Sequence, residues 1–148
     1  MARVLALDIG TRRIGVAVSD EMGILAQPLQ VIERKGIAWD VAQVASLVQA
    51  HGAQAIVVGM PYTLRGEQAS AAEQLHSFLA ALREATPVPV IPVDERFSTV
   101  EADRRMREAS VRREQGRRRV DAVAAALILE RYLNQRRNGA NGADSETA

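Results

Sequence analysis

The sequence predicts an α/β domain built on a mixed five-stranded sheet with helices on both faces. Three strand patterns come first, and the turns between them are too short for a helix, so they form an antiparallel meander. Two more strand patterns follow, each preceded by a helical pattern. Right-handed crossovers then place these later strands parallel to the first one. The predicted order of elements is βββαβαβαα.

Apolar runs define the strands. The first, Arg3–Asp8, is almost continuously apolar and ends in an acid, which is typical of a strand buried on both faces. A turn at Gly10–Arg13 leads into the second strand, Ile14–Ser19. The third, Met22–Ile32, contains Pro28, which suits the edge of a sheet. The two later strands are expected at Ala55–Val58 and Val88–Val93.

Apolar residues at helical spacing define the helices. The first runs from Ile37 to Val48 and ends near Gly52. A second spans Ala72–Leu82, and a third begins at a cap formed by Ser98 or Thr99. The last helix covers Val120–Leu133. We therefore expect a single domain over residues 1–137 and a disordered C-terminal tail over residues 138–148.

Composition narrows the classes of protein. The chain has 148 residues, no cysteine and two histidines, which excludes disulfides, thiolate zinc sites and histidine-rich metal sites. A metal would be held by carboxylates, which favours Mg²⁺ or Mn²⁺. The longest apolar run, Ala122–Leu129, is too short to cross a bilayer, and the N-terminus lacks a signal-peptide pattern. We expect a cytoplasmic protein that does not bind membranes.

Acidic residues stand where this type of sheet places its chemistry. Asp8 closes the first strand, Asp94 and Glu95 end the fifth, and Asp121 lies at the start of the last helix. Sites in open α/β sheets form outside the carboxyl ends of the parallel strands. Three carboxylates there could hold one or two hard cations that cleave a phosphodiester. Each acid alone would also fit a cap, a turn or a helix-dipole contact.

Two other features would suggest a different site: a further acid at a strand end, and a loop of the type that binds ATP phosphates. Asp20 also ends a strand, but the hairpin pairs it near Arg3, roughly 15 Å or more from Asp8 by strand rise. The run from Asp8 to Thr11 also resembles the first phosphate loop of actin-like ATPases and sugar kinases. Those folds need two large domains, whereas this chain has room for one.

Arginine dominates the basic residues. The nineteen cations comprise eighteen arginines and one lysine, Lys35, and eight arginines lie between Arg104 and Arg119 against two acids. The planar guanidinium suits phosphate, although a solvated helix face would look similar. Trp39, at the start of the first predicted helix, is expected to pack rather than to stack on bases. Aromatic residues are only 3% of the chain, so a stacking platform for single strands is not expected to be the main device for binding nucleic acid.

Four blocks together resemble the YqgF family of ribonuclease-H-like proteins, also called RuvX or Holliday-junction-resolvase-like proteins. The resemblance runs from Val4 to Leu133. The blocks are Asp8–Asp20, Gly59-Met60-Pro61 with Gly66, Asp94–Thr99, and Arg119-Val120-Asp121 with the apolar residues to Leu129. Their order and spacing are specific in combination. One departure is Thr63-Leu64-Arg65, where the family often has an Asn and an Asp-Gly pair.

The resemblance implies a ribonuclease-H-like fold and assigns site residues. It places a catalytic and metal-binding triad on Asp8, Glu95 and Asp121, with Mg²⁺ or Mn²⁺ as cofactor and Asp94 as a possible additional acid. The basic positions that would meet phosphates, by resemblance or from the arginine-rich segment, are Arg13, Arg96, Arg112, Arg113, Arg117, Arg118 and Arg119.

The resemblance also implies a function. The family is proposed to trim the 5′ end of the precursor of small-subunit ribosomal RNA (pre-16S rRNA), so we expect a metal-dependent nuclease acting on structured RNA, with ribosomal precursor particles as partners. One alternative is a Holliday junction resolvase that acts on branched DNA and needs a two-fold dimer. Another is a non-catalytic nucleic-acid-binding factor. Monomer and homodimer both stay open.

Overall fold

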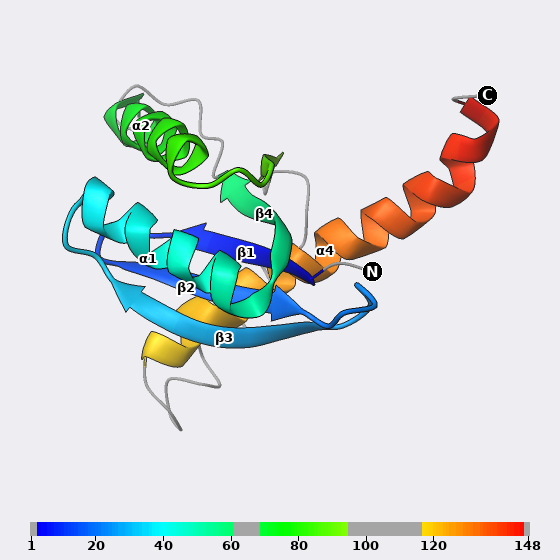
Figure 1. Ribbon diagram of the computed structural model, residues 1–148, viewed down its shortest axis with the longest axis horizontal. Helices are drawn as coiled ribbons and strands as arrows, with labels where there is room; N and C mark the ends of the chain where they lie inside the picture. The colour runs from blue at the N-terminus through cyan, green and yellow to red at the C-terminus, as the bar shows by residue number, and fades with distance from the viewer. Residues whose placement is uncertain (1–2, 61–68, 95–116, 147–148) are drawn as a thin grey trace.

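The computed structural model describes residues 3–60, 69–94 and 117–146; of residues 60, 69–72, 94, 117–120 and 137–146 it describes the backbone alone. Its sheet has the strand order β3-β2-β1-β4-β5 (Figure 1). The strands are β1 (Arg3–Ile9), β2 (Arg13–Ser19), β3 (Ala26–Glu33), β4 (Ala53–Met60) and β5 (Val90–Asp94). The helices are α1 (Ile37–His51), α2 (Ala69–Ala85) and α4 (Arg117–Glu146).

Strand β1 lies at the centre of the sheet. It pairs antiparallel with β2, and β2 pairs antiparallel with β3. On its other side β1 pairs parallel with β4, which pairs parallel with β5. The four residues Val4–Leu7 are almost fully buried, as expected of a strand covered on both faces. The predicted mixed sheet and its connectivity are confirmed.

Helices cover both faces of the sheet, which is also confirmed (Figure 1). On one face α1 and α2 pack over a cluster that includes Leu5, Leu7 and Phe78. On the other face α4 packs over Val4, Ala6 and their neighbours through Ala125, Leu127, Ile128, Leu129 and Leu133. Strand alternation therefore assigns the even positions of β1 to the α4 face. The third predicted helix, after Ser98 or Thr99, lies outside the described residues.

The third strand begins later than expected. The pattern predicts a strand from Met22, but β3 starts at Ala26. The difference arises because Asp20 Oδ1 accepts hydrogen bonds from the backbone N–H groups of Ile24 and Leu25, which form a turn instead. The N–H group of Ile24, followed by that of Leu25, lowers the pKa of the Asp20 carboxyl below its ordinary value. Pro28 lies on an edge strand, as predicted.

Helix α4 is longer than the pattern predicts. It runs for 30 residues to Glu146. A disordered tail was expected from Asn138, but the backbone is helical from Asn138 to Glu146. Once the buried part of a helix has formed, each added residue gains one hydrogen bond, and the helix extends past its packed segment. Figure 1 shows its last turns projecting away from the sheet. The domain boundary at residue 137 stays a prediction.

No helix within the described ranges is both long enough and apolar enough to cross a bilayer.

Candidate active site at the carboxyl end of β1

Asp8 lies near the end of the central strand, on the face that α4 covers. Val4 and Ala6 pack on this face, and residues two apart on a strand share a face. The Asp8 residue is half-buried, and its Cα partner across the antiparallel ladder is Gly15. Residues directly opposite in such a ladder also share a face, so Gly15 faces α4 beside Asp8.

Gly15 is a point of close contact between α4 and the sheet. A Cβ atom at this position would overlap the backbone carbonyl of Asp121, with Ala122 N at 3.0 Å. The first turns of α4 can therefore rest on β2 only because Gly15 has no side chain. Because Gly15 is also the partner of Asp8, this contact brings the start of α4, with Asp121, to the position beside Asp8.

The Asp121 carboxylate is held by an arginine from the same strand. Arg13 Nε donates to Asp121 Oδ2 at 2.7 Å, and each side chain keeps a little under a third of its surface exposed. Arg13 lies two residues before Gly15 and so shares its face. Asp8, Arg13 and Asp121 thus form one partly exposed cluster, which we call the Asp8 cluster. The small residues after Asp121 are buried against the sheet, as expected from their size.

A second clamp fixes the β1–β2 turn from the opposite side. Arg34 Nη1 donates to Gly10 O at 2.9 Å, and the Arg34 backbone N–H donates to Arg12 O at 2.9 Å. The same guanidinium donates through Nε to Asp40 Oδ2 at 2.9 Å, and the Asp40 side chain is completely buried. Asp40 Oδ1 also accepts the backbone N–H of Lys35. The turn that follows Asp8 is therefore anchored to α1.

The sequence alone does not single out Arg34 and Asp40. An acid in the first turn of a helix is ordinarily explained by the helix dipole, and the Asp40 position fits that explanation. Its burial and its pairing with Arg34 depend on how β3 and α1 meet, which no local pattern specifies. The ring of Phe78 from α2 completes this contact, since the Arg34 guanidinium carbon lies 5.5 Å from its centroid.

The remaining predicted site residues are only partly described. Asp94 pairs with Met60 at the end of β5, and Arg117, Arg118 and Arg119 begin α4, all of them described by backbone alone. The other predicted positions, Glu95, Arg96, Arg112 and Arg113, lie outside the described residues. Asp20 lies five residues beyond Gly15 on β2, well away from Asp8, as its exclusion from the site requires.

The donor chemistry of the Asp8 cluster suits a hard divalent cation. Asp8 and Asp121 offer carboxylate oxygens, the ligand type that Mg²⁺ and Mn²⁺ prefer. Within the described ranges no three acidic, histidine or cysteine side chains gather as a metal site. The described residues therefore account for two carboxylates, and a third would have to come from another part of the chain.

Comparisons with known proteins show which family the sequence matches. A family profile described as "RuvX: Holliday junction resolvase" matches residues 2–135. A protein of Desulforudis audaxviator named "Putative pre-16S rRNA nuclease" is 42% identical over 139 residues, which cover 94% of this chain and 99% of that protein. A protein of the same name from Koribacter versatilis is 43% identical over 134 residues, covering 90% of this chain and 88% of that protein.

Solved structures show the same fold at low sequence identity. The RuvC protein of T. thermophilus in complex with a Holliday junction substrate superimposes with a TM-score of 0.61 at 20% identity, over 92% of this chain and 96% of that chain. The fowlpox virus resolvase in complex with Holliday junction DNA gives a TM-score of 0.52 at 8% identity, over 90% of this chain and 97% of that chain. The predicted ribonuclease-H-like fold of resolvases is confirmed.

Replacing Gly15 with alanine should displace the start of α4. The added methyl group overlaps the Asp121 carbonyl, and overpacking of this kind lowers the free energy of unfolding by about 1–3 kcal/mol. Urea unfolding gives this value, and amide hydrogen exchange should be fastest in the first turns of α4. Val16→Ala, which removes buried atoms from the next residue, should destabilise the fold without this local effect. Unchanged exchange in α4 of Gly15→Ala would contradict the account.

Replacing Arg34 with alanine should leave the Asp40 carboxylate buried and unpaired, which costs about 3–5 kcal/mol of unfolding free energy. The Arg34→Ala, Asp40→Ala double variant should lose clearly less than the sum of the two single variants. The exposed pair Arg3–Glu21, at 3.6 Å, is the control, and its removal should change stability by less than about 1 kcal/mol. If the losses of unfolding free energy in the two single variants simply add up in the double variant, Arg34 and Asp40 do not stabilise each other.

Proposed function

We propose that this chain, which belongs to the RuvX family and is a nuclease, hydrolyses phosphodiester bonds of pre-16S rRNA at a metal site built on Asp8, Asp121 and Glu95. One observation carries the assignment of the site: Gly15 lets α4 rest on β2, and so brings Asp121 beside Asp8 at the carboxyl end of β1. Family membership favours this enzymatic role over that of a non-catalytic nucleic-acid-binding factor.

The carboxylates Asp8 and Asp121 would hold the cation, with Mg²⁺ and Mn²⁺ as the candidates. When bound, such ions lower the pKa of the attacking water and stabilise the leaving oxygen. The resemblance of the segment Asp94–Thr99 to the family favours Glu95 over Asp94 as the third acid.

Arg13 is suited first to pair with Asp121 and then to contact the phosphate of a bound substrate. Without substrate it neutralises Asp121, and this partly exposed pair keeps the carboxylate in a fixed position. A phosphodiester that approaches two carboxylates meets repulsion unless cations offset it. We assign Arg13 a contact with the phosphate in the complex, because its guanidinium already lies in the Asp8 cluster. Its fork can bind a phosphate oxygen with the nitrogens that Asp121 does not use.

The arginine-rich segment would position the nucleic-acid backbone without recognising its sequence. Arg117, Arg118 and Arg119 begin α4 a few residues before Asp121, so their backbone is fixed close to the Asp8 cluster. We extend the same role to Arg96, Arg112 and Arg113, which have the same chemistry. Binding through several such contacts should weaken steeply as salt concentration rises.

The relatives' names and the family's description point to two substrates. We favour pre-16S rRNA in cytoplasmic ribosomal precursor particles, because relatives more than 40% identical over most of their length carry that name. Cleavage of Holliday junctions is the second candidate, since the family profile carries that description. Junction resolution would require two copies that present their sites with two-fold symmetry, whereas RNA processing is compatible with a monomer.

Cleavage assays test the site and the substrate together. Labelled pre-16S rRNA and a four-way DNA junction are incubated with Mg²⁺, Mn²⁺ or a chelator. Asp8→Asn and Asp121→Asn should each lower the cleavage rate by more than about 100-fold, because each removes a charge that the reaction needs. The matched control is Asp20→Asn, which changes an acid at the far end of β2 and should keep the wild-type rate.

Either of two results would overturn part of the proposal. Cleavage that survives in Asp8→Asn, with folding shown intact by circular dichroism, would remove the site from the Asp8 cluster. A wild-type chain that cuts junctions and forms dimers, but leaves pre-16S rRNA intact, would replace RNA processing with junction resolution.

A further inference from the structure

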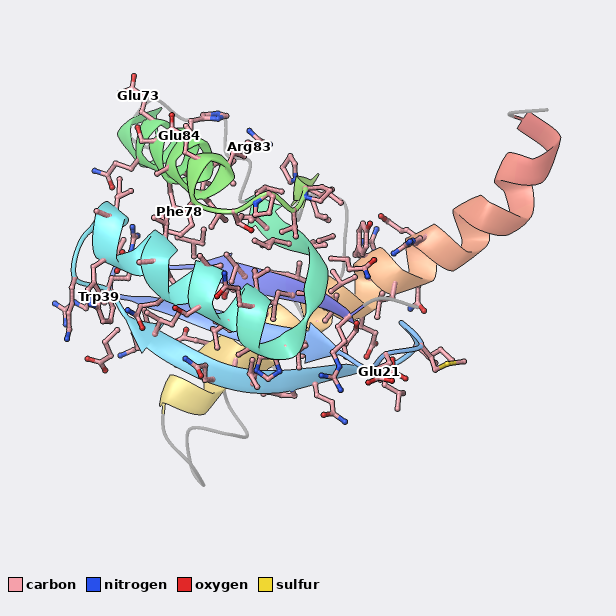
Figure 2. The ribbon with its side chains drawn as sticks, in the orientation of Figure 1. Glu21, Trp39, Glu73, Phe78, Arg83 and Glu84 are labelled. Atoms are coloured by element: carbon pink, nitrogen blue, oxygen red, sulfur yellow. The ribbon has the colours of Figure 1, made fainter. Side chains whose placement is uncertain are left out.

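An exposed tryptophan stands at the end of the molecule where β3 ends and α1 begins (Figure 2). Trp39 is the chain's single tryptophan, and 38% of it is exposed, so part of this side chain is open to solvent. The Lys35 ammonium lies 4.6 Å from the centroid of its ring. This contact is a cation–π pair in which the ammonium and part of the indole are both accessible to solvent.

The backbone that carries Trp39 is rigidly held. Its neighbour Asp40 is completely buried, and its carboxylate binds both Arg34 Nε and the backbone N–H of Lys35. Gly36 adopts a φ of 140°, which an L side chain rarely allows, and this turn places Lys35 back over the first turn of α1. Lys35 and Trp39 are therefore presented to solvent by a fixed scaffold.

The same scaffold reaches the Asp8 cluster. Arg34, which holds Asp40, also donates to Gly10 O and to Arg12 O in the turn that follows Asp8. Arg12 is exposed at this turn. The side chains of Arg12, Lys35 and Trp39 thus stand at the rim next to the candidate carboxylates, on the side of α1 rather than α4.

The chemistry of this rim matches a nucleic-acid strand. It combines two exposed cations with an aromatic ring, which are the groups that bind phosphates and stack on bases in single strands. Among the residues whose side chains the structure describes, the other exposed large apolar ones are Met22, Ile24 and Leu25, which lie beyond the end of β2 with an acid, Glu21, beside them. Figure 2 shows Glu21 and Trp39 at opposite ends of the sheet.

We propose that Trp39, Lys35 and Arg12 form a subsite for a single-stranded stretch of substrate that flanks the scissile bond. A base stacks on the Trp39 ring in place of the Lys35 ammonium, which moves onto a neighbouring phosphate together with Arg12. The inference rests on the proposed nuclease function, since it assigns this strand to the substrate of the Asp8 cluster.

The single tryptophan reports on its own surroundings, which makes the test direct. The wild-type chain in chelator, where cleavage is prevented, is titrated with a 12-nucleotide single-stranded RNA and with the same sequence as a duplex. The single strand should quench the Trp39 emission saturably and protect it from acrylamide. The duplex, whose bases are already stacked, should do so much less. Emission that stays unchanged while a labelled RNA is shown to bind would overturn the subsite.

Variants separate stacking from packing. By fluorescence anisotropy, Trp39→Ala should bind the labelled single strand about 5- to 100-fold more weakly, while Trp39→Phe keeps most of the affinity. The control Leu25→Ala, at the far end of the sheet, should bind as the wild type does. Urea unfolding of each variant excludes loss of folding as the cause. Equal affinity of Trp39→Ala and wild type would contradict the subsite.

Cleavage by the wild-type chain in Mg²⁺ distinguishes the two proposals. If RNA is cut but Trp39 does not respond to it, the subsite is wrong and the nuclease function stands. If Trp39 responds to the single strand but neither RNA nor DNA is cut under any condition, the surface binds nucleic acid and the proposed function is wrong.

Discussion

The close contact between Gly15 and the backbone of Asp121 is the constraint on which the candidate site depends. The side chains of a sheet ordinarily keep the backbone of a packed helix at a distance. Because Gly15 has no Cβ atom, the backbone of α4 comes closer to the sheet at this position. Gly15 is the partner of Asp8 in the β1–β2 ladder. The close contact of α4 with Gly15 therefore brings Asp121 beside Asp8. The buried alanines and leucines of α4 then hold the helix there.

The β1–β2 turn is held from both faces of the sheet. On the α4 side, Arg13 at its end binds Asp121; on the α1 side, Arg34 binds the Gly10 carbonyl and the buried Asp40. A carboxylate that must meet a cation and a phosphate benefits from a fixed position, because its alignment is then set before the substrate arrives. Arg13 therefore neutralises Asp121, and Arg34 holds the β1–β2 turn that follows Asp8.

Much of this fold could be predicted from the sequence, and the exceptions have physical causes. The buried run of β1 and the crossover rule were enough to give the number and direction of the strands, because both are local or topological constraints. The start of β3 was predicted too early because Asp20 captures two backbone N–H groups. The end of α4 was predicted too early because asparagine and glycine suggested a tail where the helix continues.

Part of the candidate site could be predicted from where acids stand along the chain. Asp8 and Asp121 stand out at element ends, and the structure brings their backbones together, although the assignment of the triad stays a prediction. The Arg34–Asp40 pair could not be found from the sequence, since its meaning depends on burial created by three separate elements. Trp39 was expected to pack rather than to stack on bases, and the structure leaves 38% of it exposed with the Lys35 ammonium over its ring.

The most direct test of the central claim is whether Asp8 and Asp121 bind the same ion. Mn²⁺ binding is measured by electron paramagnetic resonance for the wild type, Asp8→Asn, Asp121→Asn and the double variant. A shared ion predicts that each single variant weakens binding by at least about tenfold and that the double variant loses much less than the product of the two. Full Mn²⁺ affinity in Asp121→Asn, or losses that simply multiply, would show that the Gly15 contact does not build a common metal site.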